Sequence, residues 1–121
     1  LRAGLQTRSV APAASAQPAL AGEGLEVAAT AAIYRTDAVV RRAQALQSHP
    51  LNVAACVALH PDQAAQLQVS EGQMVKVGTD AGKATLPVVL DKRVAAGTVW
   101  IESGHGATAP LGAGRVTVVA A

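Results

Sequence analysis

Cysteine and aromatic residues are almost absent from this sequence. Its 121 residues include one Cys, one Trp, one Tyr and no Phe. A single Cys excludes an internal disulfide and is compatible with a reducing compartment. It also excludes an iron–sulfur cluster held by four cysteines of this chain alone. The shortage of aromatic side chains argues against the stacking platforms with which single-stranded nucleic-acid binders hold bases.

Strong charge and long apolar runs are missing as well. The formal net charge is +2, and only Arg41-Arg42 and Lys92-Arg93 are adjacent basic pairs. We read both pairs as solvated faces or interdomain contacts, and we predict no nucleic-acid partner. No apolar run approaches the roughly 18 residues of a membrane span, so we predict no direct membrane insertion.

What the chain does contain is a large share of small apolar residues, at 50% hydrophobic composition. A core of Val, Leu and Ala favours packed β-structure in one small domain. We assign this domain to residues 25–121, and residues 1–24, rich in Ala, Pro and Gly, to a low-complexity linker or strap. An alternative is that residues 1–10 complete a strand of a preceding domain. Because the chain does not begin with Met, we expect it to be part of a longer polypeptide.

The first half of the domain predicts a strand, a helix and a second strand. We expect an extended segment over residues 25–34 and a helix from Thr36 or Asp37 to Gln47, since both residues are good N-caps. The residues before Pro50 end this helix, because a residue that precedes proline avoids helical angles. The apolar run over 53–59 suits a central strand. The apolar face of the helix is expected to consist of Val39, Val40, Ala43 and Leu46.

The second half predicts a helical turn followed by closely spaced strands. Pro61 can open a short helix, because its missing N–H is one of the unpaired groups of a helix start. Turn candidates at 80–83 and at Gly97 separate the next strands, and residues 115–119 form a closing strand. The total is about six strands and two short helices. The inward-facing residues are expected to be Val75, Val77, Leu86, Val88, Leu90, Val99, Ile101, Val116 and Val118.

The order of these elements comes with a characteristic series of residues: His60-Pro61-Asp62, Glu71-Gly72, Val75-Lys76-Val77, Asp91, Gly97, Val99, Ile101 and Gly104. This series resembles that of a known family, the C-terminal molybdopterin-dinucleotide-binding domain of molybdopterin oxidoreductases. The resemblance implies a mainly β fold, a six-stranded double-psi β-barrel of the aspartate-decarboxylase-like kind with two short helices.

One segment, from Tyr34 to Gln47, resembles a narrower branch: the last domain of the G subunit of bacterial NADH-quinone oxidoreductase, respiratory complex I. The resemblance implies a structural end domain with an empty ancestral molybdopterin pocket and no catalysis of its own. The parent would oxidise NADH, reduce quinone and translocate protons, with its iron–sulfur clusters elsewhere. The implied partners are the rest of the G subunit and neighbouring complex I subunits. The implied location is the peripheral arm, on the cytoplasmic side of the bacterial inner membrane.

The best candidate for ligand chemistry is the loop that starts at Ser103. Gly104 and Gly106 let a ligand approach the backbone, and Ser103, His105 and Thr108 can donate hydrogen bonds to phosphate or pterin edges. In the family that the chain resembles, the loop at this position helps to hold the cofactor. The alternative is a purely structural loop, which we favour because Gly-rich loops are common turns. No P-loop sequence is present.

A second candidate, Arg35-Thr36, follows from the resemblance, because catalytic relatives contact the cofactor at the end of their first strand. Arg35 could grip a phosphate bidentately. The usual His-and-polar pattern of the catalytic members is absent here, and Asp37 is more simply a helix cap. We therefore name no catalytic and no metal-binding residue. The cofactor-binding candidates are Arg35, Thr36, Ser103, Gly104, His105 and Thr108.

The remaining polar residues with possible chemistry have simpler structural readings. His60 precedes Pro61 and is interpreted as a helix cap rather than a ligand. Cys56 lies among Val and Ala residues and is interpreted as a small core residue. The three histidines, His49, His60 and His105, show no metal-binding spacing.

A domain of this fold has two alternative functions. The first is a working molybdopterin-binding domain of an enzyme such as formate dehydrogenase or nitrate reductase, in which the two candidate loops hold the dinucleotide. The second is an independent enzyme of the aspartate decarboxylase type, which shares the barrel and cleaves itself at a Gly-Ser bond. No serine here follows a glycine, which argues against the second; the serines are Ser9, Ser15, Ser48, Ser70 and Ser103.

Overall fold

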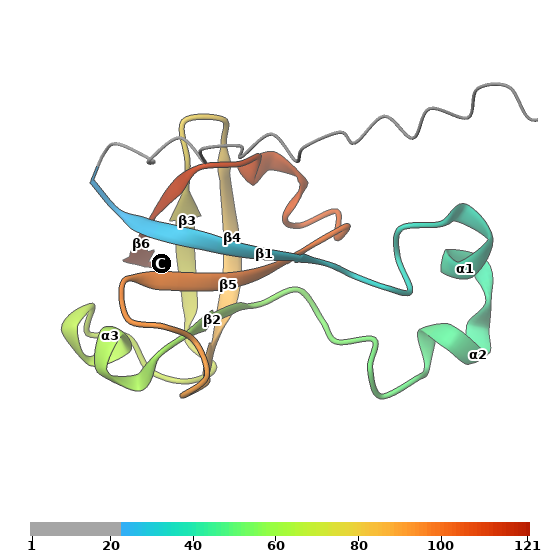
Figure 1. The fold of residues 1–121 in the computed structure, drawn as a ribbon, viewed down its shortest axis with the longest axis horizontal. Coiled ribbons are helices and arrows are strands. Elements are labelled where there is room, and N and C mark those ends of the chain that lie inside the picture. Colours follow the sequence, from blue (N-terminus) through green and yellow to red (C-terminus); the bar gives the residue numbers. More distant parts are fainter. Residues whose placement is uncertain (1–22) are drawn as a thin grey trace, which may run out of the picture.

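Six strands close into a barrel in the order β1-β5-β2-β4-β3-β6 (Figure 1). The structure, a computed structural model, describes residues 23–121. The linker predicted for residues 1–24 therefore lies almost wholly outside the described residues. The strands are β1 (Leu25–Ala31), β2 (Val57–Leu59), β3 (Met74–Gly78), β4 (Lys83–Leu90), β5 (Thr98–Ser103) and β6 (Arg115–Ala120). The short helices of the described part are α1 (Ala38–Arg42), α2 (Gln44–Gln47), α3 (Pro61–Gln66) and the 3-10 helix η1 (Ala109–Leu111).

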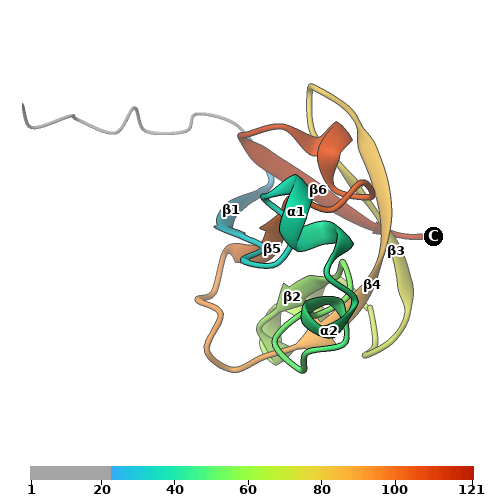
Figure 2. The same ribbon diagram turned by 90° about the vertical axis from the view of Figure 1, so that its right-hand side faces the viewer.

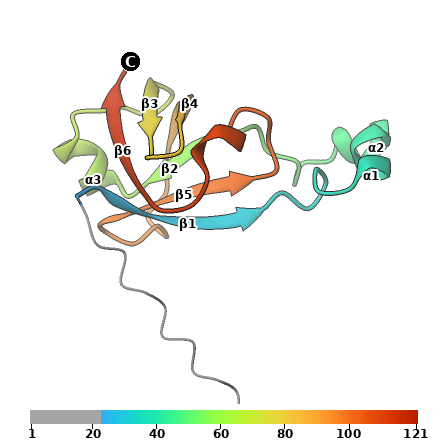
Figure 3. The same ribbon diagram turned by 90° about the horizontal axis from the view of Figure 1, so that it is seen from above.

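Two pairs of strands are parallel, and the other four pairings of the barrel are antiparallel. β1 runs parallel to β5 and β2 runs parallel to β4. The remaining neighbours, β1–β6, β2–β5, β3–β4 and β3–β6, pair antiparallel. Because β1 and β5 are parallel, the residues that follow both strands emerge at the same end of the barrel (Figure 3). That end carries the candidate site.

The core of the barrel is built from small aliphatic side chains, as the alternation along the strands predicted. On β3, for example, Val75 and Val77 are fully buried while Lys76 between them is exposed. This alternation arises because successive residues of a strand point to opposite faces of the sheet. The buried core residues include Val57, Leu59, Val75, Val77, Leu86, Val88, Val99, Ile101, Leu111, Val116 and Val118.

The first turn of α3 confirms the structural reading of His60. Its Nδ1 accepts a hydrogen bond from the backbone N–H of Asp62 at 3.2 Å, as an N-cap does, and Pro61 follows at the first helical position.

A close turn joins β3 to β4, where the N–H of Thr79 donates to the carbonyl of Gly82 at 2.8 Å. An added Cβ on Gly82 would lie 2.5 Å from the carbonyl oxygen of Pro110, so this position has no room for a side chain.

The segment between β1 and β2 departs from prediction. We call residues 33–54 the arm, since α1 and α2 stand off one end of the barrel, opposite α3 (Figures 1 and 3). β1 ends at Ala31, the expected single helix is broken into α1 and α2 at Ala43, and β2 begins only at Val57. The break occurs where the carbonyl of Val40 accepts from the side-chain amide of Gln47 (3.0 Å) and from the N–H of Ala43.

The expected apolar face of this helix is not buried. No residue of α1 or α2 is buried, and the side chain of Val39 is 76% exposed. Val40, Ala43 and Leu46 are half-buried where α1 and α2 pack on each other, and none of the four residues of the expected face belongs to the barrel core. Separately, none of the helices in residues 23–121 is long and apolar enough to cross a membrane.

Candidate functional site

A cavity of about 420 Å³ opens where the loop after β5 faces the arm. In Figure 2, seen from the side of the arm, α1 lies in front of this loop and β6. The volume is within the range of small-molecule sites in proteins, roughly 300–1,000 Å³. The residues that line the cavity are Arg41, Ser103, Gly104, His105, Gly106, Thr108, Ala109 and Gly112.

The most unusual feature of the cavity wall is a buried acid–imidazole pair. His105 Nε2 lies 2.8 Å from Glu102 Oε2, and the two side chains are only 5% and 13% exposed. Glu102 is on β5, whose inward positions belong to Val99 and Ile101, so its side chain lies on the outer side of the barrel wall. The spacing of three residues, together with the bend of the loop, brings the carboxylate of Glu102 and the imidazole ring of His105 together. The pair thereby fixes the orientation of the imidazole at the cavity.

Two hydroxyl groups of the loop are used within the protein itself. Ser103 Oγ donates to the carbonyl of Thr30 at 3.1 Å. Thr108 Oγ1 lies 3.1 Å from the carbonyl of Glu102 and 3.2 Å from that of His105, and its one proton can go to either. These bonds hold the loop in shape, and they leave the hydroxyl protons of Ser103 and Thr108 unavailable to a ligand without rearrangement.

The backbone of the loop also turns tightly. The N–H groups of Thr108 and Ala109 both donate to the carbonyl of His105 at 3.1 Å. Gly104 has a φ of 91°, in the left-handed region that favours glycine. An added Cβ there would be 3.6 Å from the Cβ of Ala32 and 3.8 Å from that of Arg35, so the loop packs against the start of the arm.

Of the six predicted cofactor-binding residues, four line the cavity and two do not. Ser103, Gly104, His105 and Thr108 are brought together there. Arg35 instead donates from Nε to Asn52 Oδ1 at 3.1 Å within the arm, and Thr36 is an exposed residue before α1.

Sequence reasoning missed two residues of the site. Arg41, interpreted as a solvated or interdomain charge, lines the cavity from α1. Glu102 was given no role, although a carboxylate three residues before a histidine is a spacing that a tight turn can bring into contact. No pattern in the sequence placed Arg41 beside a loop more than 60 residues further on, because that proximity depends on the parallel pairing of β1 and β5.

The interpretation of Cys56 as a core residue is wrong. It is only partly buried and is not among the buried core residues. Partial burial, and then the nearby Glu102 carboxylate, raise the pKa of the Cys56 thiol above its ordinary value, because both disfavour a thiolate. The raised pKa favours the neutral thiol, which is a weaker nucleophile than a thiolate.

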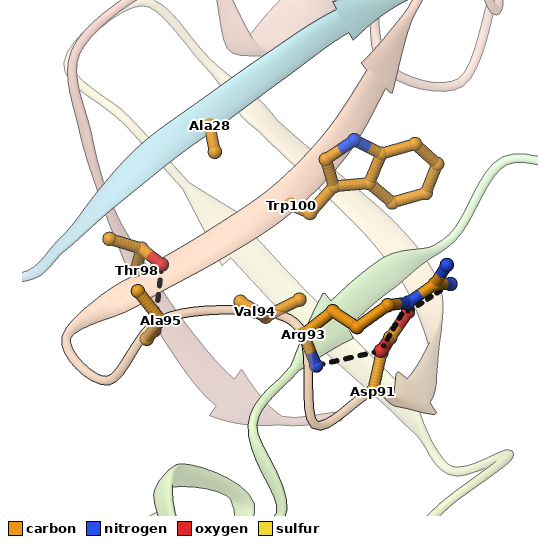
Figure 4. A pocket seen from close by; sticks show the side chains of 7 residues that line it. All are labelled: Ala28, Asp91, Arg93, Val94, Ala95, Thr98 and Trp100. Atoms are coloured by element: carbon orange, nitrogen blue, oxygen red, sulfur yellow. Dashed lines mark hydrogen bonds and ion pairs between the residues drawn. The ribbon is translucent and has the colours of Figure 1, made fainter.

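A second cavity, of about 610 Å³, lies on the outer face of β1 and β5 (Figure 4). Its wall includes Trp100, but its charged side chains and its hydroxyl group are already paired. Arg93 folds back onto Asp91 with Nη2 2.7 Å from Oδ2, and Thr98 Oγ1 donates to the carbonyl of Ala95 at 2.7 Å. This cavity is larger but contains none of the predicted residues, and it offers a ligand mainly apolar contacts.

The family of the chain follows from comparison with known domains. The family model described as "Molydopterin dinucleotide binding domain" matches residues 29–119. The chain belongs to this family. Among curated proteins none matches the sequence.

Solved structures agree on the fold. The rationally designed double-psi β-barrel proteins apDPBB_sym_79 and mkDPBB_sym1 are 20% and 22% identical to the chain, with TM-scores of 0.54 and 0.53. Each comparison covers 80% of this chain, and 94% and 95% of the designed proteins respectively. The predicted six-stranded double-psi β-barrel is thereby confirmed, with α1, α2 and α3 in place of two helices.

Acetylene hydratase from Pelobacter acetylenicus is also similar, at 23% identity and a TM-score of 0.47. The match covers 67% of this chain but only 11% of the hydratase. The chain thus spans about a tenth of the length of that larger protein.

Proposed function

We propose that this domain binds the nucleotide end of a molybdopterin dinucleotide in the cavity beside the loop 103–112, as one part of a larger oxidoreductase. The observation that carries the proposal is the cavity wall itself. It combines a cation, Arg41, with a buried imidazole, His105, and with backbone that carries no side chain at Gly104 and Gly106. A nucleotide offers phosphate oxygens to the cation and hydrogen-bonding groups to the imidazole.

The residues present fit such a group, and their role in it is binding and orientation. The cofactor supplies the oxidation–reduction chemistry of the enzymes that hold it. Arg41 would attract the phosphates, the loop backbone would approach the ligand closely at its glycines, and the arm would exclude water from one side. No acid–base step is assigned to the domain.

The test uses the 121-residue chain and GMP or CMP, either of which supplies the nucleotide part of a dinucleotide. Two-dimensional NMR spectra are recorded during titration to several millimolar, since a fragment of a cofactor is expected to bind with a dissociation constant of about 1 mM, or about 4 kcal/mol. Shifts are expected at residues 103–112 and Arg41. Arg41→Gln should weaken the response, whereas Arg42→Gln, a neighbouring cation that does not line the cavity, should not. Shifts centred on Trp100 would contradict the proposal.

A second candidate is a structural end domain of the G subunit of a bacterial respiratory complex I, with the cavity empty. Two observations favour it. The hydroxyls of Ser103 and Thr108 are used inside the loop, and the arm, whose sequence resembles that subunit, leaves Ile33, Val39 and Leu51 exposed for contact with the rest of a larger assembly. This candidate places the domain on the cytoplasmic side of the inner membrane, beside the other peripheral-arm subunits.

The two candidates are separated in the full-length parent protein. Purified parent that contains molybdenum and releases a fluorescent pterin on denaturation supports the first. A parent that lacks both and co-purifies with NADH-oxidising activity supports the second.

A further inference from the structure

The buried pair determines which nitrogen of His105 carries a proton. An ionised carboxylate is a hydrogen-bond acceptor only, and a carboxyl group is ordinarily a stronger acid than an imidazolium. The proton between Glu102 Oε2 and His105 Nε2, 2.8 Å apart, therefore belongs to the imidazole. In a neutral imidazole the other nitrogen is then an acceptor, so Nδ1 presents a lone pair.

Nδ1 is the ring nitrogen left for another partner. Its residue is 6% exposed, and none of the described residues makes a hydrogen bond to Nδ1. Yet among residues 23–121 no fully buried side-chain nitrogen or oxygen lacks a partner. Nδ1 is therefore not completely buried. The opening that His105 lines is the cavity beside the loop.

We propose that His105 determines the specificity of this cavity by accepting, at Nδ1, a hydrogen bond from an N–H or O–H group of the occupant, with Glu102 as the residue that positions the ring. The inference rests on the proposed function and makes it more specific. Phosphate oxygens have no proton to offer this nitrogen and pair instead with Arg41, the cation of the same cavity. The group at His105 is therefore a ribose hydroxyl or a base N–H.

Other charged and titratable groups near the ring do not alter this assignment. Arg35 packs near Gly104 but directs Nε to Asn52, 3.1 Å away. Cys56 is close to Glu102, and burial keeps its thiol neutral by raising its pKa. Glu102 is thus left as the charge that contacts the imidazole directly.

The first test reads the tautomer without any ligand or substitution. Long-range ¹H–¹⁵N spectra of the ¹⁵N-labelled chain are recorded at a pH at which the ring is observed to be neutral. The expected result for His105 is a protonated Nε2 and an unprotonated Nδ1. His49→Gln and His60→Gln assign the signals of the three histidines. A ring with Nδ1 protonated would overturn the inference whether or not the cavity binds nucleotides.

The second test compares GMP, ribose 5-phosphate and inorganic phosphate in the same NMR titration. GMP should bind and phosphate alone should not. If ribose 5-phosphate binds as tightly as GMP, the donor is a sugar hydroxyl. If GMP binds and ribose 5-phosphate does not, the donor is a base N–H. In Glu102→Gln the amide no longer dictates the tautomer of His105, so both tautomers should be populated. The affinity for GMP should then fall about three- to tenfold, the effect of one hydrogen bond. Glu102→Asp should restore part of the loss.

The control is Arg93→Gln in the other cavity, which should leave GMP binding unchanged. Equal GMP affinity in the wild type and in Glu102→Gln, or phosphate binding as tight as GMP binding, would overturn the role of His105 and leave the proposed function standing. If no probe shifts the resonances of residues 103–112, the proposed function fails and the inference fails with it.

Discussion

The barrel and the arm are ordered by different forces. In the barrel, side chains such as Leu59 and Val75 are fully buried, and apolar burial holds the strands together. In the arm no residue is buried, and side-chain hydrogen bonds fix its shape. Gln47 Nε2 donates to the carbonyl of Tyr34 at 2.9 Å, and Asn52 Nδ2 donates to the carbonyl of Gln47 at 2.8 Å. The candidate cavity lies between the barrel and the arm, so substitutions in the two regions should affect the cavity differently.

The largest contrast should come from removing one leucine side chain from each region. Leu59→Ala empties a fully buried position on β2, between β4 and β5, and should lower the free energy of unfolding by about 2–5 kcal/mol. Leu51→Ala in the arm, at a side chain that is 61% exposed, should change it by less than about 0.5 kcal/mol. Urea denaturation measures both. Similar losses would mean that the arm is packed as the barrel is.

A smaller effect is expected where the barrel approaches the loop of the site. Gly82→Ala would place a Cβ 2.5 Å from the carbonyl oxygen of Pro110 in η1, and the required shift should cost about 1–3 kcal/mol. Because η1 is part of the loop 103–112, NMR shifts should also extend through these residues. The same substitution at Gly106, where nothing lies within 4 Å of the added Cβ, should be well tolerated. A Gly82→Ala variant as stable as wild type, measured by the same denaturation, contradicts this.

The barrel was largely predictable from sequence because its signals are local. The alternation of Val75 and Val77 around Lys76, and the turn residues near Gly82 and Gly97, mark strands and their ends whatever lies further along the chain. The closed order of strands came from the family resemblance, since alternation identifies a strand and its buried face but not its neighbours.

The arm and the site were only partly predictable because they depend on contacts between distant residues. The four loop residues that line the cavity were found because they are adjacent in sequence. Arg41 was missed because its position beside the loop depends on how the arm leaves β1. The apolar spacing from Val39 to Leu46 predicted a buried face, but spacing cannot tell whether the covering surface belongs to the same chain.

The arm itself should respond to loss of a single polar side chain. Gln47→Ala removes donors to the carbonyls of Tyr34 and Val40, and should destabilise the arm locally by about 1 kcal/mol per bond lost. The free energy of unfolding of the barrel should hardly change. Hydrogen–deuterium exchange is expected to speed up in residues 38–47 alone. Gln44→Ala, an exposed glutamine of the same helix, is the control, and faster exchange throughout the barrel would show that the two regions are not independent.

The smallest effect should come from the ion pair on the outside of the barrel. Hydrogen bonds from the Arg93 side chain, and then from its backbone N–H, lower the pKa of Asp91 to about 2. A carboxyl group whose folded-state pKa is lowered stabilises the protein above its unfolded pKa of about 4, and this stabilisation is lost as the pH falls. The Tm of Arg93→Gln should therefore lie slightly below that of the wild type at pH 6.

That Tm difference should close as the pH falls from about 4 towards 2, because the Asp91 carboxylate takes up its proton in this range. It should also shrink at high salt at pH 6, because exposed ion pairs are screened. Lys92→Gln, at the neighbouring exposed cation, should show no such pH dependence. A Tm difference that persists unchanged at pH 2 would mean that Arg93 does not stabilise the barrel through its ion pair with Asp91.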